Sequence, residues 1–110
     1  MRPIDIVQQQ LEAYNARDLQ GFLELFAEEV EVWRMPANLP SLLGRAALGE
    51  FYANERFNRP QLHAELVNRI ALGDTVVDHE RVSGIRETPF EVIAVYRVSG
   101  GLIQSVWFHS

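Results

Sequence analysis

The stretch "LHAELVNRIALGDTVVDHERVSG", residues 62–84, predicts a β-hairpin, and this hairpin indicates the class of the fold. In the first half of this stretch, mainly apolar residues expected on one face of a strand alternate with His63, Glu65 and Arg69, which are expected on the other face. This alternation is typical of a half-buried strand. The face-sharing set is Leu62, Ala64, Leu66, Asn68, Ile70 and Leu72. "GD" at 73–74 supplies a turn, after which the alternation resumes, so we expect two antiparallel strands.

Outward from this hairpin, the chain changes from helical spacing to strand spacing. Pro3 suits a first helical turn, Asn15 ends that helix, and Asp18 is a candidate cap for the next. We expect helices over 3–15, 18–26 and 44–57, a strand over 28–35, a Pro-containing loop over 35–44, and a second hairpin over 89–110. Helices followed by a long antiparallel sheet predict an α+β domain with the helices on one face of the sheet.

Composition limits what this chain can be. Its 110 residues, 47% of them hydrophobic, suit a single globular domain over residues 1–110. The net charge of −5 argues against non-specific nucleic-acid binding, which needs a basic surface. No apolar run could span a bilayer and the N-terminus lacks a signal-peptide pattern, so we expect a soluble, cytoplasmic protein without membrane contact. The absence of cysteine excludes thiolate chemistry.

Three segments carry a resemblance to a known superfamily: "YNARDLQGFLELFAEEVEV" (14–32), "GRAALGEFY" (44–52) and "VYRVSGGLIQSVWF" (95–108). They resemble the nuclear transport factor 2-like superfamily, which includes ketosteroid isomerase and the SnoaL-like polyketide cyclases. The resemblance implies a cone-shaped, cystatin-like α+β roll, with three N-terminal helices packed on a curved, mostly antiparallel sheet. It does not imply one activity, because members range from isomerases and epoxide hydrolases to non-catalytic binding modules.

The resemblance also argues against ketosteroid isomerase activity by that family's own residues. The family's proton-shuttling aspartate corresponds to Arg34 here, its oxyanion tyrosine to Gln10, and its neutral aspartic acid to Ala94. Together those groups abstract a proton and stabilise the dienolate. All of them are replaced in this chain.

Ionisable side chains on the expected inner face form the predicted site. Alternation places Asp78 and Glu80 with Val76 and Val82, and Arg34 on the inner side of its own strand. Since isolated buried charge is unfavourable, Arg34 is the expected partner of the two acids. Two carboxylates beside one arginine could act as base and acid, so Arg34, Asp78 and Glu80 are the predicted catalytic residues. The alternative is a buried ion pair with a purely structural role.

Uncharged polar residues near this group are the predicted ligand contacts. They are Gln10, Tyr14, Tyr52, Asn68 and Gln104. The set is similar in residue types to the Asp–Arg–Asp site of limonene epoxide hydrolases, although the positions differ. We therefore expect a cofactor-independent hydrolase, isomerase or cyclase acting on a small apolar metabolite; the alternative is a non-catalytic dimeric module that binds a ligand or a protein. The 35–44 loop is expected to cover the pocket.

The opposite face of the predicted sheet is unusually apolar. Its residues include Trp33, Val77, His79, Ile93, Val95 and Trp107, with Ile103 also expected there. An apolar face of this size favours a partner, and superfamily members commonly pair through it, so we expect a homodimer. His63, His79 and His109 do not follow a zinc-ligand spacing, and no metal site is predicted.

Overall fold

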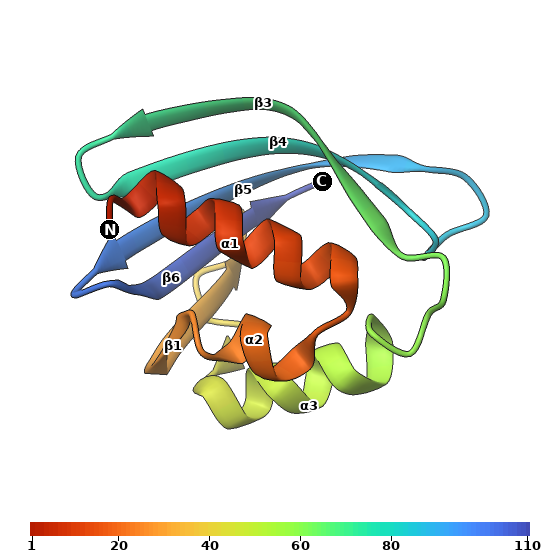
Figure 1. Cartoon of the computed structure of the whole chain (residues 1–110), viewed down its shortest axis with the longest axis horizontal. Helices are drawn as coiled ribbons and strands as arrows, with labels where there is room; N and C mark the ends of the chain where they lie inside the picture. The colour runs from red at the N-terminus through yellow and green to blue at the C-terminus, as the bar shows by residue number, and fades with distance from the viewer.

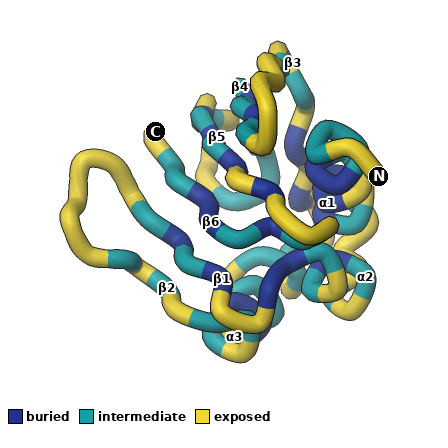
Figure 2. Tube along the Cα trace, turned by 90° about the vertical axis from the view of Figure 1, so that its left-hand side faces the viewer, coloured by how far each residue is buried: buried dark blue, intermediate teal, exposed yellow.

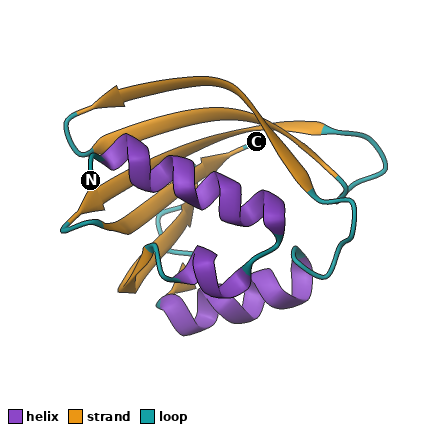
Figure 3. Cartoon of the chain, in the orientation of Figure 1, coloured by secondary structure: helices purple, strands orange, loops and turns teal.

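The computed structural model describes all residues, 1–110, and has an α+β architecture (Figure 1). The elements are α1 (Pro3–Ala16), α2 (Leu19–Leu23), β1 (Phe26–Arg34), β2 (Leu42–Leu43), α3 (Arg45–Glu55), β3 (His63–Leu72), β4 (Thr75–Ser83), β5 (Phe90–Ser99) and β6 (Leu102–His109). The strands form one six-stranded sheet in the order β2-β1-β6-β5-β4-β3, in which only β1 and β6 are parallel. The helices lie together against one face of the curved sheet (Figure 3), which confirms the predicted fold class. None of the helices is long and apolar enough to cross a membrane.

Two boundaries in the N-terminal half differ from the prediction. The second helix is only five residues long, and Phe26 begins strand β1 rather than ending a helix. Asp18 caps this short helix as expected, since its carboxylate accepts a hydrogen bond from the backbone N–H of Gly21 at 3.1 Å. Within the predicted loop at 35–44, Leu42–Leu43 forms a short strand beside β1.

The core lies between the inner face of the sheet and the helices. In Figure 2, buried segments alternate with less buried ones along the strands, as expected for a sheet with one face covered. Aromatic rings from the three helices fill the space beneath the sheet: Phe22 lies 4.8 Å from both Phe26 and Tyr52, measured between ring centroids. Tyr14 joins this cluster from α1 through Tyr52 and Phe57. Helix packing therefore closes the inner side of the sheet around an aromatic centre.

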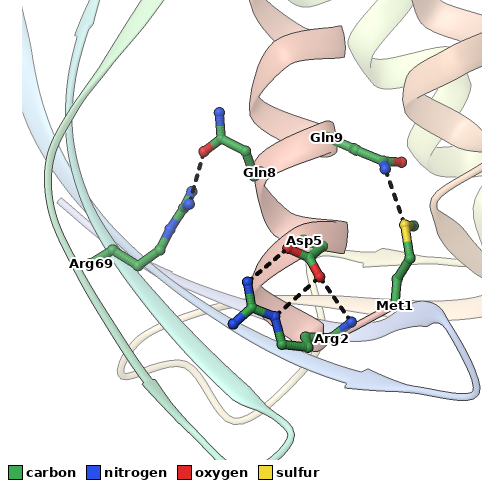
Figure 4. A network of polar contacts seen from close by, with 6 residues as sticks. All are labelled: Met1, Arg2, Asp5, Gln8, Gln9 and Arg69. Carbon is green, nitrogen blue, oxygen red and sulfur yellow. Dashed lines mark hydrogen bonds and ion pairs between the residues drawn. The ribbon is translucent and has the colours of Figure 1, made fainter.

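Side-chain hydrogen bonds fasten α1 to the edge strand β3 at two places. Near the end of the helix, the Asn15 amide both donates to the Ala64 carbonyl at 2.9 Å and accepts from the Ala64 N–H at 2.8 Å. Near its start, Gln8 Oε1 accepts a hydrogen bond from Arg69 at 2.8 Å, as drawn in Figure 4. The Asn15 bonds satisfy two backbone groups of the edge strand, and together with the Gln8–Arg69 bond they fix the helix across the sheet.

Two bulges reverse the alternation that the sequence predicted. In β3 the pairing passes from Leu66 to Asn68, leaving Val67 as the extra residue, so Arg69 turns inward and Ile70 is 63% exposed. In β6 the register shifts at Gln104, and Ile103, expected on the outer face, is fully buried. An extra residue reverses the side chains on one side of the bulge relative to those on the other, which explains the errors after Val67 in β3 and before Gln104 in β6.

Candidate functional site

A pocket of about 110 Å³ opens between the inner face of the sheet and the helices α1 and α3. Its walls are mainly apolar, with tyrosine hydroxyls, one carboxyl group and three guanidinium groups among them. The lining residues are Gln10, Leu11, Tyr14, Arg34, Phe51, Tyr52, Arg56, Ala64, Glu80, Val82, Ile85, Arg86, Phe90, Val92, Tyr96, Phe108 and Ser110. A mostly apolar concave site with a few polar groups is typical of small-molecule pockets.

Glu80 is the only acidic side chain that lines this pocket. It lies on β4 between Leu66 of β3 and Val92 of β5, and the residue is 6% exposed. Its Oε2 atom is buried without a hydrogen-bond partner. Burial raises the pKa of Glu80 from 4.5 to about 7; the nearby charge of Asp78 adds to the rise and that of Arg69 opposes it. The carboxyl group can therefore both hold and release a proton near neutral pH.

Asp78, two residues earlier on the same strand, is buried in an ion pair away from the pocket. It is 0% exposed, and its two oxygens accept hydrogen bonds from Arg69 Nε at 2.6 Å and Arg69 Nη2 at 2.9 Å. The third nitrogen of that guanidinium donates to Gln8 on α1. Asp78 does not line the pocket. Asp78 therefore forms a buried ion pair with Arg69, and not the ion pair with Arg34 that the structural alternative expected.

Arg34 lies at the end of β1 and forms no ion pair, so the expected pairing with Asp78 or Glu80 is wrong. Its side chain is exposed, and its guanidinium carbon lies 5.6 Å from the centre of the Phe108 ring. Because the strand ends here, the side chain reaches the mouth of the pocket instead of its floor. Arg34 nevertheless remains among the lining residues.

Three tyrosines and one glutamine supply uncharged polar side chains to the pocket. Tyr14 and Tyr52 lie in it as predicted, together with Tyr96 on β5, which was expected on the inner face but not as a ligand contact. Burial raises the pKa of all three phenols, that of Tyr52 to about 12, and the charge of Glu80 contributes to each rise. The phenols are therefore protonated hydrogen-bond donors at neutral pH. Gln10, also predicted, is 5% exposed and its Oε1 has no partner.

The remaining two predicted ligand contacts lie outside the pocket because of the bulges. Asn68 is exposed, and its Oδ1 accepts a hydrogen bond from the backbone N–H of Arg69 at 2.9 Å. Such a local side-chain bond competes with regular strand pairing. Gln104 is the extra residue of the β6 bulge, and its Nε2 donates to the Ser99 carbonyl at 2.9 Å. Neither amide faces Glu80.

The prediction that the 35–44 loop covers the pocket is wrong, because another segment borders the pocket. No residue of the 35–44 loop lines the pocket; the β4–β5 connection supplies Ile85 and Arg86 instead. Arg56 at the end of α3 is the other unexpected cation. These residues lie in irregular structure, where hydrophobic periodicity carries no information about direction.

None of the three histidines lines the pocket. His79 contacts Glu91 across the outer face of the sheet. Nowhere in the chain do three histidine or acidic side chains gather closely enough to hold a metal ion.

Comparison with known proteins agrees with the fold. A structure of an uncharacterised cystatin-fold protein from Novosphingobium aromaticivorans superposes with a TM-score of 0.87 at 24% identity, covering 98% of this chain and 97% of that one. A proposed polyketide cyclase from Sinorhizobium meliloti gives 0.81 at 19% identity, over 98% and 99% of the two chains. A protein of ketosteroid isomerase-like fold from Catenulispora acidiphila, solved in complex with trimethylamine, gives 0.79 at 20% identity, over 100% and 87%.

At these identities the structural likeness establishes the fold alone, and no curated protein matches the chain. The family model described as the SnoaL-like domain, however, matches residues 7–106. This chain therefore belongs to the SnoaL-like domain family, within the nuclear transport factor 2-like fold.

Proposed function

We propose that the protein binds a small, largely apolar molecule in this pocket and that Glu80 exchanges a proton with it, as in a cofactor-independent isomerase or cyclase. One observation carries the proposal: the Glu80 carboxyl lines a mainly apolar pocket, and its buried Oε2 has no hydrogen-bond partner. Native proteins rarely leave a buried polar atom unsatisfied, and such atoms concentrate where a ligand or substrate completes them.

Proton transfer is favoured over hydrolysis by a pair of carboxylates. A two-carboxylate mechanism needs one acid to activate water and another to protonate the leaving group. Asp78 is excluded from that role because Arg69 occupies both of its oxygens. Glu80 is left as a single carboxyl group, which suits removal of a proton from one atom and its return to another.

The tyrosines complete the proposed chemistry. Ionised Glu80 would take a proton from a carbon next to a substrate carbonyl, and the electron pair of the broken C–H bond would move to the carbonyl oxygen as an enolate. A phenol of Tyr14, Tyr52 or Tyr96 would donate a hydrogen bond to that oxygen. In a β,γ-unsaturated ketone the enolate extends over the neighbouring C=C bond, so protonated Glu80 would return the proton to the γ-carbon while the C=C bond moves into conjugation with the re-formed carbonyl, and the enzyme ends in its starting state.

The size of the pocket limits the reacting part of the substrate. Its volume of about 110 Å³ is somewhat below the roughly 150 Å³ of an engineered protein cavity that binds benzene. The buried portion of the ligand is therefore about one small ring, and any larger ligand would extend through the mouth.

The test is carbon-bound hydrogen exchange. Small cyclic ketones and enones are incubated with the protein in D₂O, and loss of the α-proton signal is followed by NMR. Wild-type protein should accelerate exchange of at least one compound, and Glu80→Gln should slow it by roughly 100-fold or more. Glu91→Gln, which removes an exposed carboxylate from the neighbouring strand β5, is the matched control and should retain the wild-type rate. Equal rates for wild type and Glu80→Gln would contradict the proposed role.

A non-catalytic binding module is the second candidate. It is favoured by the replacement of every ketosteroid isomerase residue, at Gln10, Arg34 and Ala94. In the same experiment this candidate predicts that a compound perturbs the NMR signals of pocket residues without any exchange of its α-proton.

We further propose that the outer face of the sheet mediates a homodimer. Cross-strand neighbours form a continuous apolar row in the order Trp33, Trp107, Val95, Val77 and Ile70, flanked by Ile93 and His79. No helix covers this face (Figure 1), and each of the strand-centre residues Trp33, Trp107, Val95 and Val77 remains partly accessible. A second copy of the face would remove the row from water.

A further inference from the structure

The mouth of the pocket is surrounded by arginines that stack on aromatic rings. Arg86 lies over Phe90 with its guanidinium carbon 3.9 Å from the ring centre. Arg56 lies over Phe51 at 5.0 Å and Arg34 over Phe108 at 5.6 Å. These are the only three such contacts in the protein, and all six residues line the one pocket. We call Arg34, Arg56 and Arg86 the arginine collar.

The collar carries positive charge that the protein leaves unneutralised. None of its guanidinium groups forms an ion pair; the three ion pairs of the chain belong to Arg2, Arg69 and His79. The only acidic side chain in the pocket is Glu80, so three arginines face one carboxyl group there. The whole chain, by contrast, has a net charge of −5. Three arginines without an ion-pair partner therefore line this pocket of an acidic protein, where their charge would attract an anion.

The ring contacts prepare these arginines for a ligand. A guanidinium attracted to the face of a ring is held near it, so less side-chain freedom is lost when the guanidinium binds an anion. Planar guanidinium groups match carboxylates in a two-point contact. The ring-lined walls below would accept the apolar part of the same molecule.

We propose that the ligand class of this pocket is a small apolar carboxylate, whose carboxylate stays at the arginine collar while its hydrocarbon part enters toward Glu80. This inference rests on the proposed function, in that it assigns a substrate class to the same pocket. A carboxylate is favoured over a phosphate because the helix end at the mouth is the C-terminus of α3, at Arg56, whose partial negative charge disfavours a dianion. Phosphate sites use helix N-termini.

The test compares a carboxylate with its neutral isostere. Cyclopentylacetate, cyclopentylacetamide and cyclopentylmethylphosphonate are titrated separately into ¹⁵N-labelled protein at low ionic strength, and affinities are read from amide shifts of pocket residues. The carboxylate should bind about tenfold or more tightly than the amide, and added salt should reduce the difference. Arg34→Gln and Arg86→Gln should each reduce this preference several-fold. Arg97→Gln, which removes an exposed arginine of β5 outside the pocket, should leave it unchanged.

Other results would overturn the inference in distinguishable ways. Equal affinities for the acid and the amide would refute the ligand class while leaving the pocket, and Glu80, as the proposed site. Tighter binding of the phosphonate would refute the preference for a carboxylate. A carboxylate preference that survives both arginine substitutions would refute the role of the collar. If none of the compounds shifts the pocket signals, the ligand class is contradicted, whereas the proposed function is refuted only by the hydrogen-exchange experiment.

Discussion

Removal of Arg69 should destabilise the fold far more than the loss of an ordinary arginine. Arg69→Met leaves the Asp78 carboxylate, 0% exposed, without the two hydrogen bonds of 2.6 and 2.9 Å that it now accepts. Breaking one partner from a buried ion pair costs about 3–5 kcal/mol, because the other charge remains buried and unpaired. In a domain of this size, a loss of about 3 kcal/mol lowers Tm by more than roughly 10 °C.

The two partners should not be equivalent. Asp78→Asn leaves a cation whose side chain is 11% exposed and which keeps its bond to Gln8, so its cost should be about 1–3 kcal/mol. The double variant Arg69→Met/Asp78→Asn removes both charges and should be more stable than Arg69→Met alone. The two single substitutions should therefore show a favourable coupling energy of about 1–3 kcal/mol in a double-mutant cycle.

The assay is urea unfolding at a fixed protein concentration, followed by circular dichroism and extrapolated to water. A fixed concentration is needed because a dimer would make stability depend on it. Arg81→Met, which removes an exposed arginine from β4, is the control and should lie within about 0.5 kcal/mol of wild type. An Arg69→Met cost below about 1 kcal/mol, or strict additivity of the two changes, would show that the ion pair does not anchor this part of the sheet.

Three further predictions concern pH, backbone conformation and assembly. Burial raises the pKa of Glu80 from 4.5 to about 7, so between these pH values the folded state holds a proton that the unfolded state has released. As the pH rises through this range, the free energy of unfolding of the wild type should fall by roughly 3 kcal/mol relative to that of Glu80→Gln. Urea unfolding of both proteins at about pH 5 and about pH 8 would measure the difference. Gly84 and Gly100 both have positive φ, but a Cβ at Gly84 would lie 2.2 Å from the Gln61 carbonyl oxygen, whereas a Cβ at Gly100 meets nothing within 4 Å. Gly100→Ala should lower the free energy of unfolding by about 1–2 kcal/mol, and Gly84→Ala should lower it clearly more. Equal shifts in Tm for the two variants would contradict this. Trp107→Glu should convert a dimer of wild-type chains into monomers in sedimentation velocity, and an unchanged sedimentation coefficient would place any interface elsewhere.

Much of the architecture could be predicted from the sequence because the signal is periodic. The hairpins, the helices covering one face of the sheet, and the inward direction of Asp78 and Glu80 on β4 follow from alternation that is unbroken in that strand. On β3 the same reasoning failed after Val67, since a bulge leaves no mark in hydrophobic alternation. The one available signal for the bulge was Arg69: without the bulge, Asp78 would have had no cation from the neighbouring strand β3 on its own face of the sheet.

The site was predictable in part for a related reason. Gln10, Tyr14 and Tyr52 lie on regular helix faces, and their direction into the pocket could be inferred from spacing. Arg56 follows the end of helix α3, and Arg86 lies in the connection between strands β4 and β5. Whether their side chains approach the pocket therefore depends on tertiary packing. The separation of Asp78 and Glu80 into a structural acid and a pocket acid likewise depends on where one guanidinium lies.

The most direct test of the account is the titration of Glu80 itself. The side-chain carboxyl carbon is observed by ¹³C NMR in protein labelled at glutamate, and its signal is assigned by its loss in Glu80→Gln. We predict a midpoint of about 7, because burial raises the pKa of this carboxyl group. A midpoint near the ordinary value of 4.5 would mean that the carboxyl is solvated or paired, and Glu80 would then lose its role as the proton-exchanging group of the pocket.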